Sequence, residues 1–91
     1  MKEKFLKALV SETRRKILKQ LAESYKTPSD LSRLIGKSKS TVVEHLQKLE
    51  EVGLVERVKR PGRKWVFYRL TKEGRSLVSS STRSIVIILS L

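Results

Sequence analysis

Residues that could perform covalent or metal chemistry are scarce in this 91-residue sequence, which has no cysteine and one histidine, His45. Without cysteine, disulfides, thiolate metal ligands and a cysteine nucleophile are excluded. One imidazole cannot supply the several nitrogen or sulfur ligands that a zinc site needs. No acid–base pair, nucleophile–base pair or phosphate-cradling loop is visible, so the sequence predicts no enzyme, no metal site and no cofactor.

The chemistry that the sequence does favour is electrostatic. It contains 21 Lys and Arg residues against 9 Asp and Glu residues, which gives a formal net charge of +12. Such an excess suits a polyanionic partner, because each neutralised phosphate releases condensed counterions. Nucleic acid is therefore the expected class of partner. A merely solvated basic surface would have the same composition, and only the placement of the charges separates the two.

A polar stripe in the segment 38–52 could hydrogen-bond to the edges of base pairs. At 100° per residue, Val42, Leu46 and Leu49 fall on one helical face and the polar side chains project away from it. A glutamine can pair with adenine, a carboxylate can accept from the cytosine amino group, and a valine can touch the thymine methyl group. The residues expected to meet double-stranded DNA here are Lys37, Lys39, Ser40, Thr41, Val43, Glu44, Gln47 and Lys48.

Two short helices must position this stripe. The segment 27–30 supplies a capping Thr, a proline at the first helical position and a carboxylate in the first turn. The apolar face of this helix would carry Leu31, Leu34 and Ile35. Gly36 then interrupts the pattern just before Ser38, which caps a second helix that Gly53 ends. Helices joined by a short glycine-containing turn are typical of a helix-turn-helix, here over about 27–53, although an ordinary packed helix pair has similar spacing.

Two more helices are expected before this unit. Residues 2–10 have apolar side chains at helical spacing, and Ser11 caps the next segment, whose apolar stripe contains Ile17, Leu18 and Leu21. The cations of that second helix would lie along its exposed side, where they could touch phosphate or remain solvated. They are Arg14, Arg15, Lys16 and Lys19.

After Gly53 the hydrophobic period changes from 3.6 to 2, which predicts a β-hairpin of two strands, 54–60 and 64–70, around the turn 61–63. Val66, Tyr68 and Leu70 would face the core. Six cations and no acid occur from Arg57 through Arg69. Cations on edge strands also oppose aggregation, but the cluster at the tip favours contact with a phosphate backbone or a minor groove. The hairpin residues expected to bind DNA are Arg60, Arg63 and Lys64.

The end of the chain contains an apolar run that needs cover. Thr71 caps a last helix that Gly74 weakens, and residues 85–89 are consecutively apolar. These residues could be covered by their own domain or by a second copy of the chain. Their pattern does not decide between a strand and a helix. We expect a homodimer in which 72–91 is the dimerisation segment. The interface would contain Phe5, Leu6, Leu9, Ile85, Val86, Ile87, Ile88 and Leu89.

No part of the sequence predicts membrane insertion or secretion. The apolar run at 85–89 is far shorter than the roughly 20 residues of a spanning helix. The first ten residues mix charges with apolar side chains, unlike a signal peptide. We therefore expect a cytoplasmic protein without a membrane partner.

With these elements in this order, the chain resembles the ArsR family of bacterial and archaeal transcription regulators over residues 5–78. The resemblance rests on LVSETRRKILKQL, on the HLxxLxxxGLV pattern that begins at His45, on VFYRL at the end of the hairpin, and on LTKEG, which is also similar to MarR-type regulators. It implies one winged helix-turn-helix domain over 1–91, mainly α with a small β-hairpin (α+β). It also implies a homodimer that reads a roughly palindromic operator and blocks an overlapping promoter.

Two features depart from the family pattern. Metal-sensing members carry cysteines near the helix-turn-helix or His and Asp on the last helix, whereas this chain has no cysteine and no histidine there, so a metal response is not expected. The family often has Ser two residues before the motif histidine, whereas Val43 stands here, so the base preference can differ. His45 is interpreted as a packing and hydrogen-bonding residue on the core side of its helix.

Three functions fit the sequence. A sequence-specific transcription regulator would prefer its site over random DNA by a factor of about 10³ or more. An architectural chromatin protein would bind with strong salt dependence and little sequence preference. A winged-helix protein-interaction module would bind DNA weakly. Glu44 favours the first, because a carboxylate hinders indiscriminate phosphate binding but can accept from cytosine. The sequence indicates no particular operator, gene or effector.

Overall fold

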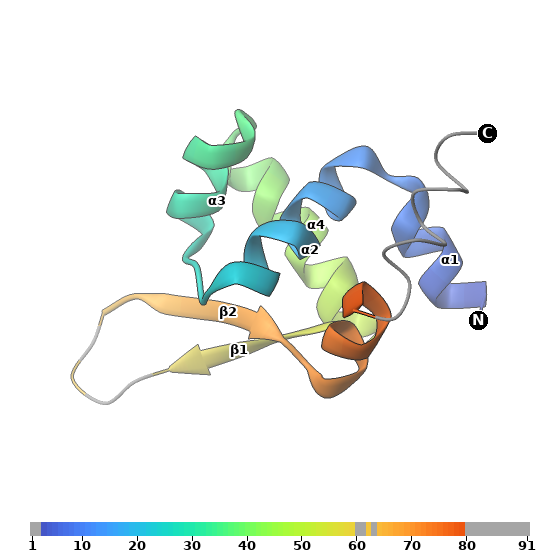
Figure 1. Ribbon diagram of the computed structural model, residues 1–91. Coiled ribbons are helices and arrows are strands. Elements are labelled where there is room, and N and C mark those ends of the chain that lie inside the picture. The colour runs from blue at the N-terminus through green and yellow to red at the C-terminus, as the bar shows by residue number, and fades with distance from the viewer. Residues whose placement is uncertain (1–2, 60–61, 63, 80–91) are drawn as a thin grey trace.

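The computed structural model describes residues 3–59, 62 and 64–79, which form helices followed by a two-stranded hairpin and one more helix (Figure 1). This order confirms the predicted α+β winged helix-turn-helix. The elements are α1 (Glu3–Val10), α2 (Glu12–Glu23), α3 (Pro28–Ile35), α4 (Lys39–Glu51), β1 (Val55–Lys59), β2 (Val66–Leu70) and a last helix at residues 72–79.

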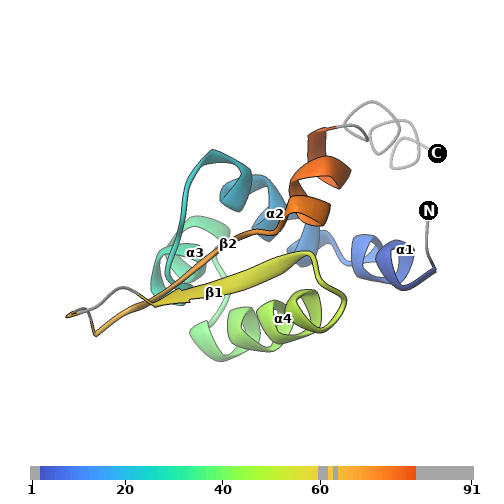
Figure 2. The ribbon, with the colours of Figure 1, turned by 90° about the horizontal axis from the view of Figure 1, so that it is seen from below.

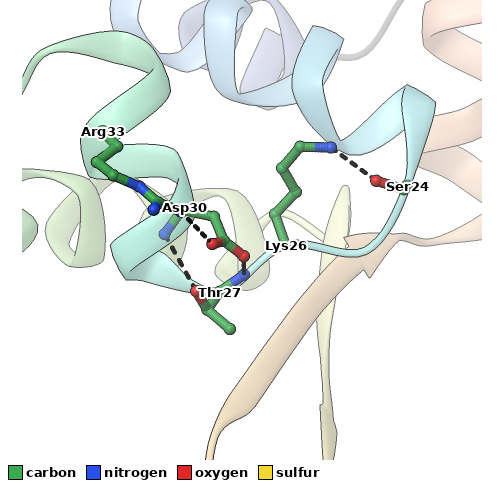
Figure 3. Close-up of polar contacts among 5 residues, drawn as sticks. All are labelled: Ser24, Lys26, Thr27, Asp30 and Arg33. Atoms are coloured by element: carbon green, nitrogen blue, oxygen red, sulfur yellow. Dashed lines mark hydrogen bonds and ion pairs between the residues drawn. The ribbon is translucent and has the colours of Figure 1, made fainter.

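Side chains immediately before the helices fix where α2, α3 and α4 begin. The Ser11 hydroxyl accepts from the Arg14 amide, and the Ser38 hydroxyl accepts from the Thr41 amide, both at 3.2 Å. At α3 the bonds are reciprocal, because Thr27 Oγ1 accepts from the Asp30 amide at 3.1 Å and Asp30 Oδ2 accepts from the Thr27 amide at 3.0 Å (Figure 3). The three predicted caps are confirmed, and each satisfies amides that a helix start leaves unpaired.

Two glycines with positive φ end the helices of the helix-turn-helix. Gly53 has φ +82° after α4, as the sequence predicts, and Gly36 has φ +78° after α3. At the second of these ends the Gly53 amide donates to the Glu50 carbonyl at 3.0 Å, and the Leu54 amide donates to the Leu49 carbonyl at 2.9 Å. This pair of bonds lets the chain leave α4 and enter β1 without an intervening loop.

One apolar core joins all the elements. Helix α2 lies at its centre and contacts α1, α3, α4 and β2. The predicted stripes of α2 and α4 are buried, but in α3 only Leu31 is buried and Leu34 remains 55% exposed, so the prediction for Leu34 is wrong. The reason is that the neighbours of α3 cover its Leu31 side only. The buried apolar residues are Ala8, Leu9, Ile17, Leu18, Leu21, Leu31, Val42, Leu46, Leu49, Leu54, Val55, Tyr68, Leu70 and Leu77.

The hairpin strands are antiparallel, with Val55 opposite Leu70 and Lys59 opposite Val66. They are shorter than the predicted 54–60 and 64–70. Tyr68 and Leu70 are buried, which confirms the predicted core face. A further pairing, which the sequence did not predict, joins Lys26 to Tyr68 through amide–carbonyl bonds of 3.1 and 2.8 Å. This bridge fixes the start of α3 against β2.

The last helix packs closely on the start of β1. Thr71 Oγ1 accepts from the Gly74 amide at 3.0 Å, which confirms the predicted cap, and the Thr71 amide donates to the Leu54 carbonyl at 3.0 Å. Gly74 is buried, and a Cβ on it would lie 2.0 Å from the Leu54 carbonyl oxygen. The sequence expectation that Gly74 merely weakens this helix was therefore incomplete, because the absent side chain allows the close approach.

We expect Gly74→Ala to lower the free energy of unfolding by about 1–3 kcal/mol, because the added methyl group forces backbone apart. Helix propensity alone predicts the opposite sign, a gain of about 1 kcal/mol. Denaturant unfolding followed by circular dichroism measures the difference. The exposed neighbour Arg75 provides the control, and Arg75→Ala should change stability by less than about 0.5 kcal/mol. An unchanged or more stable Gly74→Ala variant would contradict the close contact.

Candidate nucleic-acid interface

Helix α4 has two contrasting faces. Val42, Leu46 and Leu49 have no exposed area, and the side chains on the opposite face are accessible. Lys39, Ser40, Glu44, Gln47 and Lys48 are exposed, and Thr41 and Val43 are half-buried. The structure therefore brings the sequence-predicted residues of α4 together on one surface, with the core behind them.

The turn before α4 is held by side-chain hydrogen bonds. Ser32 Oγ donates to the Lys37 carbonyl at 2.6 Å, which links α3 to the turn. Ser38 Oγ also donates to Thr41 Oγ1 at 2.9 Å. The hydroxyls thus organise the first turn of α4, while Lys37 and Lys39 are exposed beside it.

The exposed cations differ in whether a carboxylate lies nearby. Arg57 Nε lies 3.2 Å from Glu50 Oε2 and Arg69 Nε lies 2.6 Å from Glu56 Oε1, so the acids of α4's last turn and of β1 neutralise hairpin arginines. Lys48 has only an exposed 3.8 Å pair with Glu51. In the described part of the chain, the exposed cations around the start of α4 and in the hairpin that lie within 4.0 Å of no carboxylate are Lys37, Lys39, Lys59 and Lys64.

These unpaired cations lie around the start of α4 and in the hairpin, on the side of the molecule away from α1 (Figure 2). The hairpin projects past α3 and the start of α4, on the side away from α1 (Figure 2). Lys64 lies toward the turn of this hairpin, two residues before β2 begins, and is exposed. Arg60 and Arg63, which the sequence also assigns to DNA contact, lie outside the described residues.

His45 joins α4 to α2. Its Nδ1 accepts from Arg14 Nε at 3.1 Å, across 31 positions of sequence. Burial, and next the positive charge of Arg14, lower the pKa of His45 from its ordinary value. The imidazole is therefore neutral at pH 7 with its proton on Nε2, which agrees with the packing and hydrogen-bonding role predicted for it.

The sequence predicts that Arg14 and Arg15 lie along the exposed side of their helix, but the structure places both in contact with other parts of the chain. Arg14 is half-buried against His45, and Arg15 donates from Nη1 to the Leu9 and Val10 carbonyls at 2.7 and 2.8 Å. Arg15 thereby satisfies carbonyls that the end of α1 leaves unpaired. Sequence reasoning missed both roles, because the partners lie on other helices.

Features that would support a different site are lacking in the described ranges. No group of three or more His, Cys, Asp or Glu side chains there could hold a metal ion. No helix among these residues is both long enough and apolar enough to cross a membrane.

Comparisons with known proteins identify a family and solved structures that this chain resembles. The model of the arsR family of bacterial regulatory proteins matches residues 11–57. Reduced HlyU from Vibrio cholerae is 31% identical, with a TM-score of 0.76 over 88% of this chain and 83% of that one. The transcriptional repressor BigR from Xylella fastidiosa is 30% identical, with a TM-score of 0.74 over 88% and 81%.

A third solved structure shares the fold at lower identity. The homodimeric winged helix-turn-helix DNA-binding domain of Mb0332 from Mycobacterium bovis, a possible ArsR-family regulator, is 24% identical, with a TM-score of 0.77 over 91% of this chain and 75% of that one. No curated protein sequence matches the chain.

The burial of His45, together with the neighbouring Arg14, predicts a pH dependence of stability. The folded pKa of His45 lies below the unfolded value of about 6.5. The contribution of neutral His45 to the free energy of unfolding is therefore fully present above pH 6.5, and it is lost as the pH falls through the folded pKa. NMR titration of the only histidine should give a pKa below 6.5, and His45→Gln should flatten the stability profile between about pH 7.5 and 5.5. A pKa at or above 6.5 would contradict the buried position of His45 beside Arg14.

Proposed function

The chain belongs to the ArsR family of bacterial regulatory proteins, and we propose that it is a homodimeric repressor that reads an operator sequence with α4. Membership makes the chain a DNA-binding transcriptional regulator and not an enzyme. In the proposed complex α4 enters the major groove, and the hairpin of residues 54–70 contacts the flanking backbone or minor groove.

The two-sided character of α4 carries this proposal. The stripe on one face is buried completely, so the helix is fixed in position and its other face is available along its whole length. A helix about 10–12 Å wide fits the major groove of B-DNA, which is about 12 Å wide. The base edges there would meet the N-terminal and outward residues Lys39, Ser40, Thr41, Val43, Glu44 and Gln47.

Glu44 is the residue that favours sequence reading over indiscriminate binding. It is exposed, and it has no ion pair among the described residues. A free carboxylate in the groove repels phosphates but can accept a hydrogen bond from a cytosine amino group, while Gln47 one turn later can pair with adenine. An architectural protein would gain nothing from this carboxylate.

Backbone contacts would come from the cations that flank α4. Lys37, Arg60, Arg63 and Lys64 are proposed to meet phosphates or a minor groove. Lys48 would exchange its 3.8 Å pair with Glu51 for a phosphate, because an exposed ion pair of this kind contributes little. Such contacts set affinity and register, and they do not select a sequence.

The dimer is proposed to form through α1 and the segment 72–91. On α1, Leu6 is 48% exposed and Val10 is 74% exposed. Leu9, which the sequence placed in the interface, is buried in the core of its own domain and is therefore assigned to the fold. Phe5 is half-buried against the same core. The remaining interface residues proposed from the sequence lie outside the described ones: Ile85, Val86, Ile87, Ile88 and Leu89.

We expect Glu44→Ala and Gln47→Ala to change which DNA sequences are preferred. Selection from a random duplex library gives the wild-type site, and its single-base variants are then ranked by affinity for each protein. Removing a hydrogen bond to a base should cost about 1–3 kcal/mol at one position and relax the preference there. Glu51→Ala removes a carboxylate from the far end of α4 and should leave the ranking unchanged. An unchanged ranking for both variants would contradict base reading.

We expect deletion of residues 85–91 to convert a dimer into a monomer and to reduce operator affinity strongly. A two-fold dimer places two recognition helices about 34 Å apart, so the second half-site binds intramolecularly. Sedimentation measures the mass, and circular dichroism checks that the domain is still folded. A truncated protein that stays dimeric, or a full-length protein that sediments as a monomer at micromolar concentration, would contradict the dimer.

A further inference from the structure

A shallow hollow lies between the start of α3 and the beginning of β2. Its volume is about 540 Å³. Figure 3 shows its α3 side, where Thr27, Asp30 and Arg33 lie together above the strand. The residues that line the hollow are Thr27, Ser29, Asp30, Arg33, Trp65 and Phe67.

The aromatic wall of this hollow is not needed by the core. Side chains alternate along a strand, and the buried Tyr68 and Leu70 already provide the core face of β2. Trp65 and Phe67 therefore share the opposite face, and Trp65 is 59% exposed. A tryptophan that a small domain leaves exposed is typical of a binding surface, because its large ring gains most from being covered.

The charge of the hollow is compatible with a polyanion. Asp30 is its acidic residue, but Arg33 Nη2 lies 2.7 Å from one carboxylate oxygen and the Thr27 amide donates to the other. The Thr27 amide is also the main cause of the lowered pKa of Asp30. Arg33 retains further N–H donors beyond the one that Asp30 accepts. Lys64, adjacent to Trp65, is exposed and unpaired within the described ranges.

The hollow lies beside the hairpin, which the proposed function places on DNA, and beside α3, the helix that leads to α4. The Lys26–Tyr68 bridge holds the start of α3 beside β2, and α3 leads directly into the turn before α4. The hairpin and the α3–α4 turn both lie on the side of the molecule away from α1 (Figures 1 and 2). A DNA strand that passes from the groove occupied by α4 to the hairpin would run along this surface.

We propose that the hollow binds the sugar–phosphate backbone of one DNA strand, with the Trp65 ring against a deoxyribose and the free N–H groups of Arg33 on the adjoining phosphate. This inference rests on the proposed function, because it requires α4 and the hairpin to hold the same duplex. The contact is to the backbone, so it adds affinity equally to all sequences. An apolar contact also releases no condensed counterion, so Trp65 should not affect the salt dependence of binding.

The experiment uses the intrinsic fluorescence of the protein, because Trp65 is its only tryptophan. The full-length protein is titrated with a duplex selected from a random library and with mixed-sequence duplex of equal length. Both should move the emission to shorter wavelength and reduce quenching by acrylamide, because the ring leaves water.

Variants then separate the apolar contact from the charged ones. Trp65→Ala should weaken binding to both duplexes by about tenfold, with an unchanged slope of log K against log salt. Trp65→Phe should restore most of the lost affinity.

The charged contacts are tested by the salt dependence of binding. Arg33→Ala should reduce the magnitude of the slope by about 1, and an R60A/R63A/K64A variant should reduce it by about 1 for each phosphate that the hairpin no longer neutralises. Leu34→Ala removes an equally exposed apolar side chain outside the hollow and should change neither quantity. Equal thermal midpoints confirm that the variants are folded.

Three results would overturn the inference. The first is unchanged tryptophan emission while labelled duplex is fully bound, and the second is wild-type affinity in Trp65→Ala. The third is an emission shift that depends on protein concentration without DNA, which would make the hollow a protein interface. If wild type shows no preference for any sequence, the proposed operator reading fails, whereas a tryptophan shift with mixed-sequence duplex would still support this contact.

Discussion

Burial of the apolar stripe of α4 is the interaction on which the rest of the structure depends. Val42, Leu46 and Leu49 are fully buried and pack with α2 and β1. Removing one such leucine typically costs about 2–5 kcal/mol, a large part of the stability of a domain of this size. Because this burial fixes the rotation of α4 about its own axis, it also decides which residues can face a groove. Stability and the proposed DNA reading are therefore assigned to opposite faces of one helix.

Local interactions explain why much of this fold could be predicted. The caps at Ser11, Thr27 and Ser38 join residues three positions apart, and Gly53 ends α4 through bonds within its own turn. Such contacts depend only on residue types and spacing, which a sequence displays. For the same reason, the change of hydrophobic period after Gly53 predicts the hairpin and the side of its second strand that faces the core. The helical period of α4 likewise predicts which of its side chains are exposed.

The contacts that were not predicted join residues far apart in the chain. Arg14 could be assigned to a solvated face until the fold placed His45 beside it, 31 positions away. Gly74 looked unfavourable in a helix until Leu54 was found against it. Leu9 and Leu34 share helical spacing with core residues, but only the neighbouring elements decide which of them is covered. Periodicity gives the direction of a side chain, whereas burial also requires something opposite it.

The distribution of carboxylates shows how so basic a domain can present its charge selectively. Glu50 and Glu56 neutralise Arg57 and Arg69 where the hairpin joins the body of the protein, and Asp30 is satisfied by its own helix start and Arg33. Exposed pairs contribute little to stability, so their main effect is on the field around the molecule. Arg57 and Arg69 are compensated in this way, while Lys37 beside α4 and Lys64 in the hairpin turn lie within 4.0 Å of no carboxylate among the described residues. Positive potential therefore remains beside α4, where a phosphate backbone would have to lie for the helix to reach the bases.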